Sequence, residues 1–343
     1  MIPFSSLLRP IGLVGGVAAL HAVETGLARW LAGGPLAFTA VELIRPGERR
    51  VYPLIGLPAE WEPQLADLSQ PRPPFAGLSL ERPLLMGIVN ATPDSFSDGG
   101  AHAAAEAAVR HAATLLESGA DLIDVGGEST RPGAAIVLAE EQIRRIEPVI
   151  RALAERGAVI SVDTRDPKVM RAALASGARI VNDVSALAAP DAIETVKRSG
   201  ASAVLVHMRG EPRTMQEDPR YQDVTLEVMR FLAGRIAACA AAGVPPGRLA
   251  VDPGIGFGKR GRHNAAVLEE LAALHGLGLP LVISASRKGW IGALEAWPPP
   301  ERLGGSLAAA LAALDRGAQI LRVHDVTQTY QARLAWERLN RPP

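Results

Sequence analysis

Polar and ionisable side chains stand at the ends of short apolar runs along this chain, and they fall into two chemical groups. One group is rich in hydrogen-bond acceptors and comprises Asp124, Asp163, Asn182 and Asp252. Buried carboxylates are costly unless donors meet them, so either a metal ion or a heterocycle with several N–H groups fits this group. The other group comprises Lys288, Arg322 and His324, cationic side chains that favour an oxyanion or a departing phosphate. Together they indicate a donor-rich ring on one side of a site and a phosphorylated leaving group on the other, although any single charge fits a structural ion pair equally well.

Two loops and one glycine-rich segment add to these groups. Residues 90–100 and 126–133 form long polar loops, with Phe96 alone among polar residues in the first and Arg131 beside two hydroxyl groups in the second. Loops of this kind on a rigid scaffold commonly carry function, and helix capping by Asp or Ser would account for only one of them. Segment 252–259, DPGIGFGK, is not a P-loop, because Pro253 stands in place of the first glycine and Arg260 follows the lysine. Its alternate glycines allow the backbone to pass close to a flat ligand.

Eight apolar runs carry these side chains at or just beyond their ends, and continuous apolar runs are typical of parallel strands buried on both faces. Ala-rich segments with helical spacing separate the runs, and many close with a glycine, which adopts the left-handed cap at low cost. Eight strand–helix units with no strand left over predict a (β/α)8 TIM barrel with its active site at the C-terminal strand ends; an open doubly wound sheet is the alternative. The runs are 84–89, 122–125, 158–162, 179–181, 203–206, 249–251, 281–283 and 320–323, and the glycines are Gly119, Gly157, Gly177, Gly200, Gly243, Gly276 and Gly317.

Length, charge and cysteine content limit the class of protein. The chain has 343 residues. A barrel typically takes about 250 residues, so residues 81–343 are expected to form it and residues 1–80 to form an extension. Lysine plus arginine equals aspartate plus glutamate at 36 each, so the net charge does not indicate a nucleic-acid or membrane partner. The single cysteine, Cys239, excludes a disulfide framework and a cysteine-rich zinc site and is expected in the core. This composition suits a cytoplasmic enzyme.

The N-terminal extension is expected to be a small α+β element. Its apolar stretch 11–31 contains His21, Glu24 and Arg29, so it makes a poor transmembrane span, and residues 1–22 read better as an amphipathic helix than as a signal peptide. Residues 38–44 and 50–55 predict two short strands around a Pro-Gly turn. Residues 58–74 are rich in proline and lack a period, which indicates a linker. The extension shows no feature that indicates its role.

Seven segments resemble, in order, the signature motifs of the dihydropteroate synthase family. They are MGIVNATPDSFSDGG at 86–100, DVGGESTRPGA at 124–134, SVDT at 161–164, NDV at 182–184, DPGIGFGK at 252–259, SRK at 286–288 and RVHD at 322–325. The similarity spans roughly residues 82–340 and is highly specific, but it does not include the first 80 residues.

The resemblance implies a transferase of folate biosynthesis, a sulfonamide target, that uses Mg2+. It joins 6-hydroxymethyl-7,8-dihydropterin diphosphate to 4-aminobenzoate and releases diphosphate; the family also suggests a homodimer. By position, the expected pterin-binding residues are Asp124, Asp163, Asn182, Met208, Asp252 and Lys288, with Phe257 also in the substrate site. The diphosphate is expected at Asn90, Arg322 and His324, with Mg2+ on Asn90. Phe96 and Pro132 are expected to sandwich the aminobenzoate ring, Thr130 and Arg131 to belong to a mobile loop, and Asp98 to close the site. The implied catalytic residues are Asp98, Arg131, Lys288, Arg322 and His324.

Two departures from the family pattern keep alternatives open. Gly289 follows SRK where the family usually has serine, whose hydroxyl meets the aminobenzoate carboxylate, so aminobenzoate and sulfonamides are expected to bind somewhat weakly. Ser284 and Ala285 replace the usual Gly-Thr, which is expected to tighten the pterin pocket. A non-catalytic pterin-binding paralogue is therefore one alternative. A methyltetrahydrofolate methyltransferase is another, although it would not need the TPDSF loop or the pair Arg322 and His324.

Overall fold

The computed structural model describes residues 7–45, 47–91, 100–128 and 137–342, and its main body is a barrel of eight parallel strands. The strands are β5 (Leu84–Asn90), β6 (Leu122–Gly126), β7 (Ile160–Asp163), β8 (Ile180–Asp183), β9 (Ser202–Val206), β10 (Leu249–Asp252), β11 (Val282–Ile283) and β12 (Ile320–Val323). They pair in the order β10-β9-β8-β7-β6-β5-β12-β11, and a parallel bridge between Val251 and Leu281 joins the two ends. The predicted (β/α)8 barrel is confirmed, and the open sheet is wrong.

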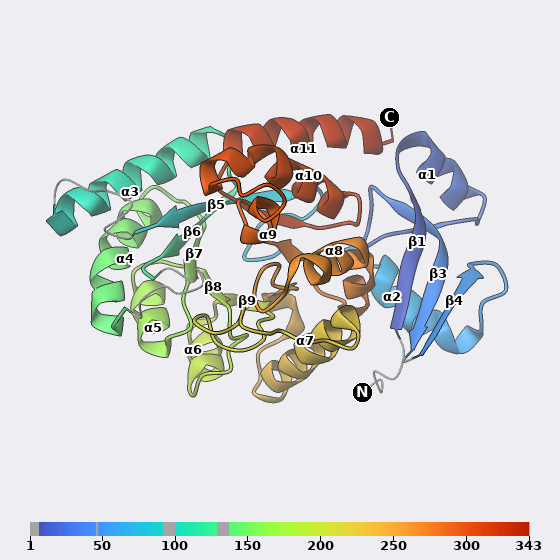
Figure 1. Ribbon diagram of the computed structural model, residues 1–343, viewed down its shortest axis with the longest axis horizontal. Helices are drawn as coiled ribbons and strands as arrows, with labels where there is room; N and C mark the ends of the chain where they lie inside the picture. The colour runs from blue at the N-terminus through green and yellow to red at the C-terminus, as the bar shows by residue number, and fades with distance from the viewer. Residues whose placement is uncertain (1–6, 46, 92–99, 129–136, 343) are drawn as a thin grey trace.

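An outer ring of helices covers the strands (Figure 1). The ring consists of α3 (Gly100–Glu117), α4 (Ala139–Ala154), α5 (Pro167–Ala175), α6 (Ala192–Ser199), α7 (Val224–Ala241), α8 (Gly261–Glu269), α10 (Leu303–Leu314) and α11 (Val326–Asn340). Six of the seven predicted cap glycines have a positive φ. The prediction of a helix cap at Gly276 was wrong, because the chain continues past α8 as the 3-10 helix η4 (Leu271–Leu277). Gly278 takes the left-handed conformation instead, with φ +70°.

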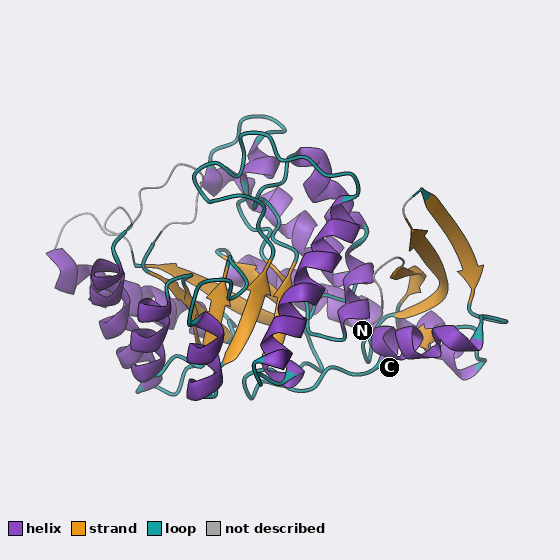
Figure 2. Ribbon diagram, turned by 90° about the horizontal axis from the view of Figure 1, so that it is seen from below, coloured by secondary structure: helices purple, strands orange, loops and turns teal. Residues whose placement is uncertain are grey.

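Strand alternation decides which side chains reach the inside of the barrel. Leu122, Ile180 and Ala250 belong to an apolar cluster inside the barrel, together with Phe75 from the segment that precedes β5. The residues two positions further along these strands are Asp124, Asn182 and Asp252, which therefore share that inward face nearer the C-terminal ends. The barrel thus has an apolar floor and a polar mouth, and loops gather near the arrowheads of the strands (Figure 2).

Residues 7–69 form a separate antiparallel sheet with two helices beside the barrel (Figure 1). Its elements are β1 (Leu7–Val14), α1 (Gly16–Glu24), β2 (Arg29–Trp30), β3 (Ala37–Arg45), β4 (Glu48–Pro53), the 3-10 helix η1 (Ala59–Trp61) and α2 (Glu62–Ser69). The two predicted strands are present as β3 and β4. A helix through residues 7–14 was wrong, because Pro10 and Gly12 disfavour helix and this stretch pairs along β3. The linker at 58–74 was also wrong over residues 59–69, where η1 and α2 lie.

The extension packs against the barrel without a gap in the apolar core. Leu31, Leu65 and Leu68 belong to the same buried cluster as the apolar side chains on the outer face of the barrel strands. Arg72 donates from Nη2 to the backbone carbonyl of His275 in η4 at 2.9 Å. Cys239, predicted in the core, is buried and free. No helix in the described ranges combines the length and apolarity needed to cross a bilayer.

Candidate active site

Arg322 stands at the centre of the charged groups in the barrel mouth. Its Nε donates to Asp124 Oδ2 at 2.6 Å, and its Nη2 donates to Asp163 Oδ2 at 2.7 Å. Its Nη1 donates to Ser284 Oγ at 3.3 Å. β12 positions the guanidinium, and β6, β7 and the end of β11 supply its partners. The predicted acceptor and cationic groups do converge, but they are not separate as expected, because Arg322 bridges them.

Two buried carboxylate oxygens in this mouth have no hydrogen-bond donor within the part of the chain that the structure describes. Asp124 Oδ2 also accepts from Asn182 Nδ2 at 3.0 Å, but Oδ1 of Asp124 and Oδ1 of Asp163 lack hydrogen-bond partners in the described chain. Burial raises the pKa of Asp163 to about 7 even though Arg322 opposes the rise. Burial also raises the pKa of Asp252 to about 6, against the hydrogen bond from the Gly254 backbone N–H at 2.7 Å. Unpaired acceptors this deep favour a ligand that carries N–H donors.

Lys288 faces the aromatic ring of Phe257 across the same mouth. Its Nζ lies 4.0 Å from the ring centroid, a cation–π distance. Burial, and then the positive charge of Arg322, lower the pKa of Lys288 to about 8. Met208, just beyond β9, packs against the apolar cluster that includes Phe257. A flat ring at this place would meet an ammonium group, an aromatic ring and a thioether.

His324 is held by Ser286, a residue that the sequence did not single out. Its Nδ1 lies 3.1 Å from Ser286 Oγ, and its backbone N–H donates to the same oxygen at 3.2 Å. Burial, followed by the charges of Arg322 and Arg287, lowers the pKa of His324 to about 3. This low pKa favours a neutral imidazole at physiological pH, whereas the sequence predicted a cationic His324. Ser286 stands two positions after Ser284, just beyond β11, and that alternate spacing was the available signal for it.

Asn90 ends β5 opposite Gly126 of β6 and is half-buried. Its side-chain oxygen lies 3.8 Å from the point where a Cβ on Gly126 would be, so the glycine leaves space beside the amide. In the described ranges no three His, Cys, Asp or Glu side chains are grouped as metal ligands. A single amide oxygen fits Mg2+, which commonly takes one or two protein ligands and completes its shell with phosphate oxygens and water. It does not fit a metal held by an all-protein cage.

The glycine segment after β10 is a tight connector rather than a phosphate cradle. Gly254, Gly256 and Gly258 have φ values of +69°, +83° and +61°. A Cβ on Gly254 would lie 1.8 Å from the His207 carbonyl oxygen, so only glycine fits there. A Cβ on Gly256 would lie 3.2 Å from Lys288 Cδ. The close neighbours of these glycines are thus the loop after β9 and the lysine of the site.

Five predicted site residues lie outside the described residues: Phe96, Asp98, Thr130, Arg131 and Pro132. Gly289 is described; it is exposed and begins the four-residue helix α9 (Gly289–Gly292). A Cβ built on Gly289 would meet no atom within 4 Å. The position thus has room for the serine hydroxyl that the family pattern carries.

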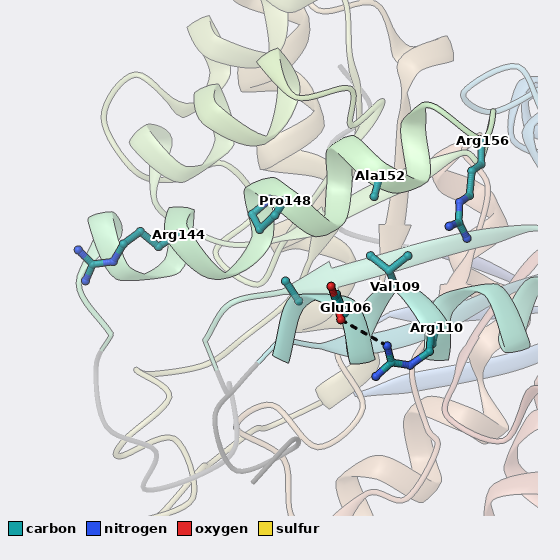
Figure 3. A pocket seen from close by; sticks show the side chains of 8 residues that line it. Glu106, Val109, Arg110, Arg144, Pro148, Ala152 and Arg156 are labelled. Atoms are coloured by element: carbon teal, nitrogen blue, oxygen red, sulfur yellow. Dashed lines mark ion pairs between the residues drawn. The ribbon is translucent and has the colours of Figure 1, made fainter. Parts of the chain in front are cut away.

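A groove of about 510 Å³ lies away from the mouth, between α3 and α4 on the outside of the barrel (Figure 3). Its apolar floor includes Val109, Pro148 and Ala152, and its rim includes Arg110 and Arg144. Arg110 forms an ion pair with Glu106 at 3.7 Å. The groove is lined by none of the strand-end residues, so we do not assign it to the reaction.

Comparison with known proteins gives one consistent result. The family profile described as pterin binding enzyme matches residues 86–324. The dihydropteroate synthase of Escherichia coli K12 is 50% identical over 256 residues, 74% of this chain and 91% of that protein. That of Neisseria meningitidis serogroup B is 49% identical over 269 residues, 76% of this chain and 94% of that protein.

Solved structures agree with the sequence relatives. The Xanthomonas albilineans dihydropteroate synthase with 4-aminobenzoic acid has a TM-score of 0.72 and 50% identity, and the match covers 77% of this chain and 96% of that one. The same enzyme in complex with 7,8-dihydropteroate has a TM-score of 0.69 and 46% identity, with 76% and 95% coverage. The chain belongs to the dihydropteroate synthase family of pterin-binding enzymes.

Proposed function

We propose that this protein condenses 6-hydroxymethyl-7,8-dihydropterin diphosphate with 4-aminobenzoate to give 7,8-dihydropteroate and diphosphate. The observation that carries the proposal is that two buried oxygens in the mouth of the barrel, Asp124 Oδ1 and Asp163 Oδ1, have no hydrogen-bond donor among the described residues. A pterin offers amine and lactam N–H donors to such oxygens. Relatives at 41–50% identity over about three quarters of this chain are dihydropteroate synthases, which supports the same substrates here.

The pterin ring would lie against Asp124, Asp163, Asn182, Asp252, Met208, Phe257 and Lys288. Asn182 already donates to Asp124, so its amide oxygen is left as an acceptor for a ring N–H. The Lys288 ammonium lies over Phe257 at 4.0 Å and would donate to a carbonyl or ring nitrogen of the pterin. Carboxylates around an electron-rich ring would also stabilise positive charge on it during the reaction.

Arg322 and His324 would receive the diphosphate. The guanidinium has five N–H donors, and its bonds to Asp124, Asp163 and Ser284 use three of them. Two donors remain for phosphate oxygens, so Arg322 can bind the leaving group while it keeps its hydrogen bonds to both carboxylates. With the Ser286 hydroxyl donating to Nδ1, a neutral His324 would donate from Nε2 and would add no charge of its own. Asn90 would hold Mg2+, which when bound neutralises negative charge on the diphosphate.

The reaction would begin with ionisation at the methylene carbon. The C–O bond to the diphosphate breaks first, Arg322 stabilises the departing anion, and the aryl amine then attacks the cation. No strong general base is needed, because the amine loses its proton after attack. Water must be excluded meanwhile, a role we assign to the loops that carry Phe96, Asp98 and Arg131. A large secondary isotope effect at the methylene is expected, and a value near unity would argue against ionisation first.

The experiment that tests the function is a condensation assay. Purified protein is supplied with both substrates and Mg2+, and dihydropteroate and diphosphate are measured separately. Equal amounts of the two products support the proposal. Pterin binding without either product would indicate the non-catalytic paralogue. Methyl transfer from methyltetrahydrofolate in place of condensation would indicate the methyltransferase. Asp163→Asn is a variant of the site itself, and it should weaken pterin binding.

Three further expectations belong to the same proposal. We propose a homodimer, to be tested by sedimentation, and a cytoplasmic location. We also propose that residues 1–80 form an N-terminal extension that packs on the barrel of residues 81–343, with the reaction confined to the barrel. Sedimentation as a monomer at micromolar concentration would contradict the first of these.

A further inference from the structure

One buried cation in the barrel mouth has no part in the reaction as described above. The side chain of Lys259 is only 2% exposed. Its Nζ lies 2.8 Å from His207 Nδ1, 3.0 Å from the Gly254 carbonyl oxygen and 3.2 Å from the Phe257 carbonyl oxygen. An ammonium group has three N–H donors, and these are three neutral acceptors. Burial lowers the pKa of Lys259 to about 7, because desolvation disfavours the charged form.

The three acceptors belong to two different loops. His207 directly follows β9, whereas Gly254 and Phe257 lie in the glycine segment after β10. The loops touch closely, since a Cβ on Gly258 would lie 2.3 Å from the Arg209 carbonyl oxygen. Burial and the neighbouring Lys259 lower the pKa of His207 to about 2, so its neutral ring can accept at Nδ1. Lys259 therefore fastens one loop to the other.

The segment that Lys259 holds in place, residues 252–259, forms part of the expected pterin-binding side of the site. Gly254 donates its backbone N–H to Asp252 Oδ1 at 2.7 Å and so orients that carboxylate. The Phe257 ring lies under Lys288 at 4.0 Å. Asn264 of α8 adds a second anchor, because its Oδ1 accepts from the Gly256 backbone N–H at 2.7 Å. A shift of this segment would displace Asp252 and Phe257 together and would move the Phe257 ring away from the Lys288 ammonium.

We propose that Lys259 is a positioning residue for the pterin site: by tying the segment after β10 to His207, it holds Asp252 and Phe257 where the ring binds. The assignment of the ring as a pterin rests on the proposed function. Lys259 touches no substrate atom in this proposal. Its effect should fall on the pterin and leave 4-aminobenzoate unchanged, since the expected aminobenzoate contacts lie in other loops.

The test is steady-state kinetics of full-length Lys259→Met, which keeps the side-chain length and removes all three donors. The KM for the pterin diphosphate should rise at least about fivefold, while the KM for 4-aminobenzoate stays within about twofold. Arg333→Met is the matched control. Arg333 is also a buried cation, 3% exposed, and it donates to the Pro83 carbonyl oxygen at 2.7 Å near the start of β5. The Arg333→Met variant should be less stable than the wild type, with no change in the KM of either substrate.

Each outcome decides the proposal. If Lys259→Met lowers only the active fraction, or raises both KM values equally, Lys259 is a structural residue and the proposal is wrong. If the variant does not fold, Lys259→Gln, which keeps two donors, must show a smaller but selective rise in the pterin KM. A wild-type protein without condensation activity rejects the proposed function instead. Pterin titration of wild type and variant then still tests Lys259 through the dissociation constant.

Discussion

Replacing Arg322 by methionine tests the charge arrangement in the barrel mouth most directly. The substitution keeps the apolar stem and removes the guanidinium from two carboxylates, Asp124 at 0% and Asp163 at 8% side-chain exposure. Removing one partner of a buried ion pair typically costs about 3–5 kcal/mol. With a urea m-value of roughly 3 kcal/mol/M, the unfolding midpoint should fall by about 1–1.7 M near pH 8.

The pH dependence of this loss follows from Asp163. Its folded-state pKa, about 7, lies above the unfolded value of 3.8, so the folded protein binds more protons between these two values and stability falls as pH rises through that window. Above pH 7 this contribution levels off in the wild type. Without the guanidinium the pKa of Asp163 rises further, so the variant should keep losing stability above pH 7.

Urea denaturation at pH 6 and at pH 8.5 measures this difference. The gap in free energy of unfolding between wild type and Arg322→Met should widen at pH 8.5. Adding Asp163→Asn to the variant should recover part of the stability at pH 8.5, because the unpaired carboxylate is then gone. A gap that stays constant with pH, or that narrows at pH 8.5, would refute the reasoning. So would a double variant no more stable than the single one.

Three further substitutions test other parts of the site. Gly289→Ser should lower the KM for 4-aminobenzoate roughly two- to twelvefold, the equivalent of one hydrogen bond of about 0.5–1.5 kcal/mol, because the site has room for the side chain. An unchanged KM would mean that the hydroxyl is irrelevant here. His324→Asn should lower kcat but keep the shape of the pH–rate profile between pH 5 and 8, since burial holds the pKa of His324 at about 3. If the variant loses a limb of the pH–rate profile near pH 6.5, the imidazole titrates in that range. Gly254→Ala should lower the free energy of unfolding by at least about 2 kcal/mol, because residue 254 has a φ of +69° and the new Cβ would lie 1.8 Å from the His207 carbonyl oxygen. Near-normal stability in urea would contradict this packing.

The barrel and the place of its site were predictable because both follow from local patterns. An apolar run such as 122–125 fits a buried parallel strand, and the observed strand, β6, is Leu122–Gly126. Helix ends were marked by glycines such as Gly157 and Gly243, both with positive φ. The failures arose where a partner distant in the sequence overrode a local pattern. In residues 7–14 the apolar content suggested a helix, but the partner that makes them a strand is β3, about 30 residues away.

The contacts within the site were not predictable in the same way. Arg322 and Asp124 are separated by 198 positions, and their 2.6 Å contact depends on the register of β12, β5 and β6 in the closed barrel. The low pKa of His324 was not predictable, because burial and the nearby guanidinium groups are tertiary effects.

The sequence alone determined which residue types reach the mouth of the barrel, because side-chain alternation and strand ends are set by neighbours a few residues apart. Only the tertiary structure decided which of those side chains touch and how they are charged. Hydrogen-bond geometry and desolvation depend on distances of a few ångströms between strands that are far apart in the chain. That is why the acids and the arginine, expected on opposite sides, are found paired.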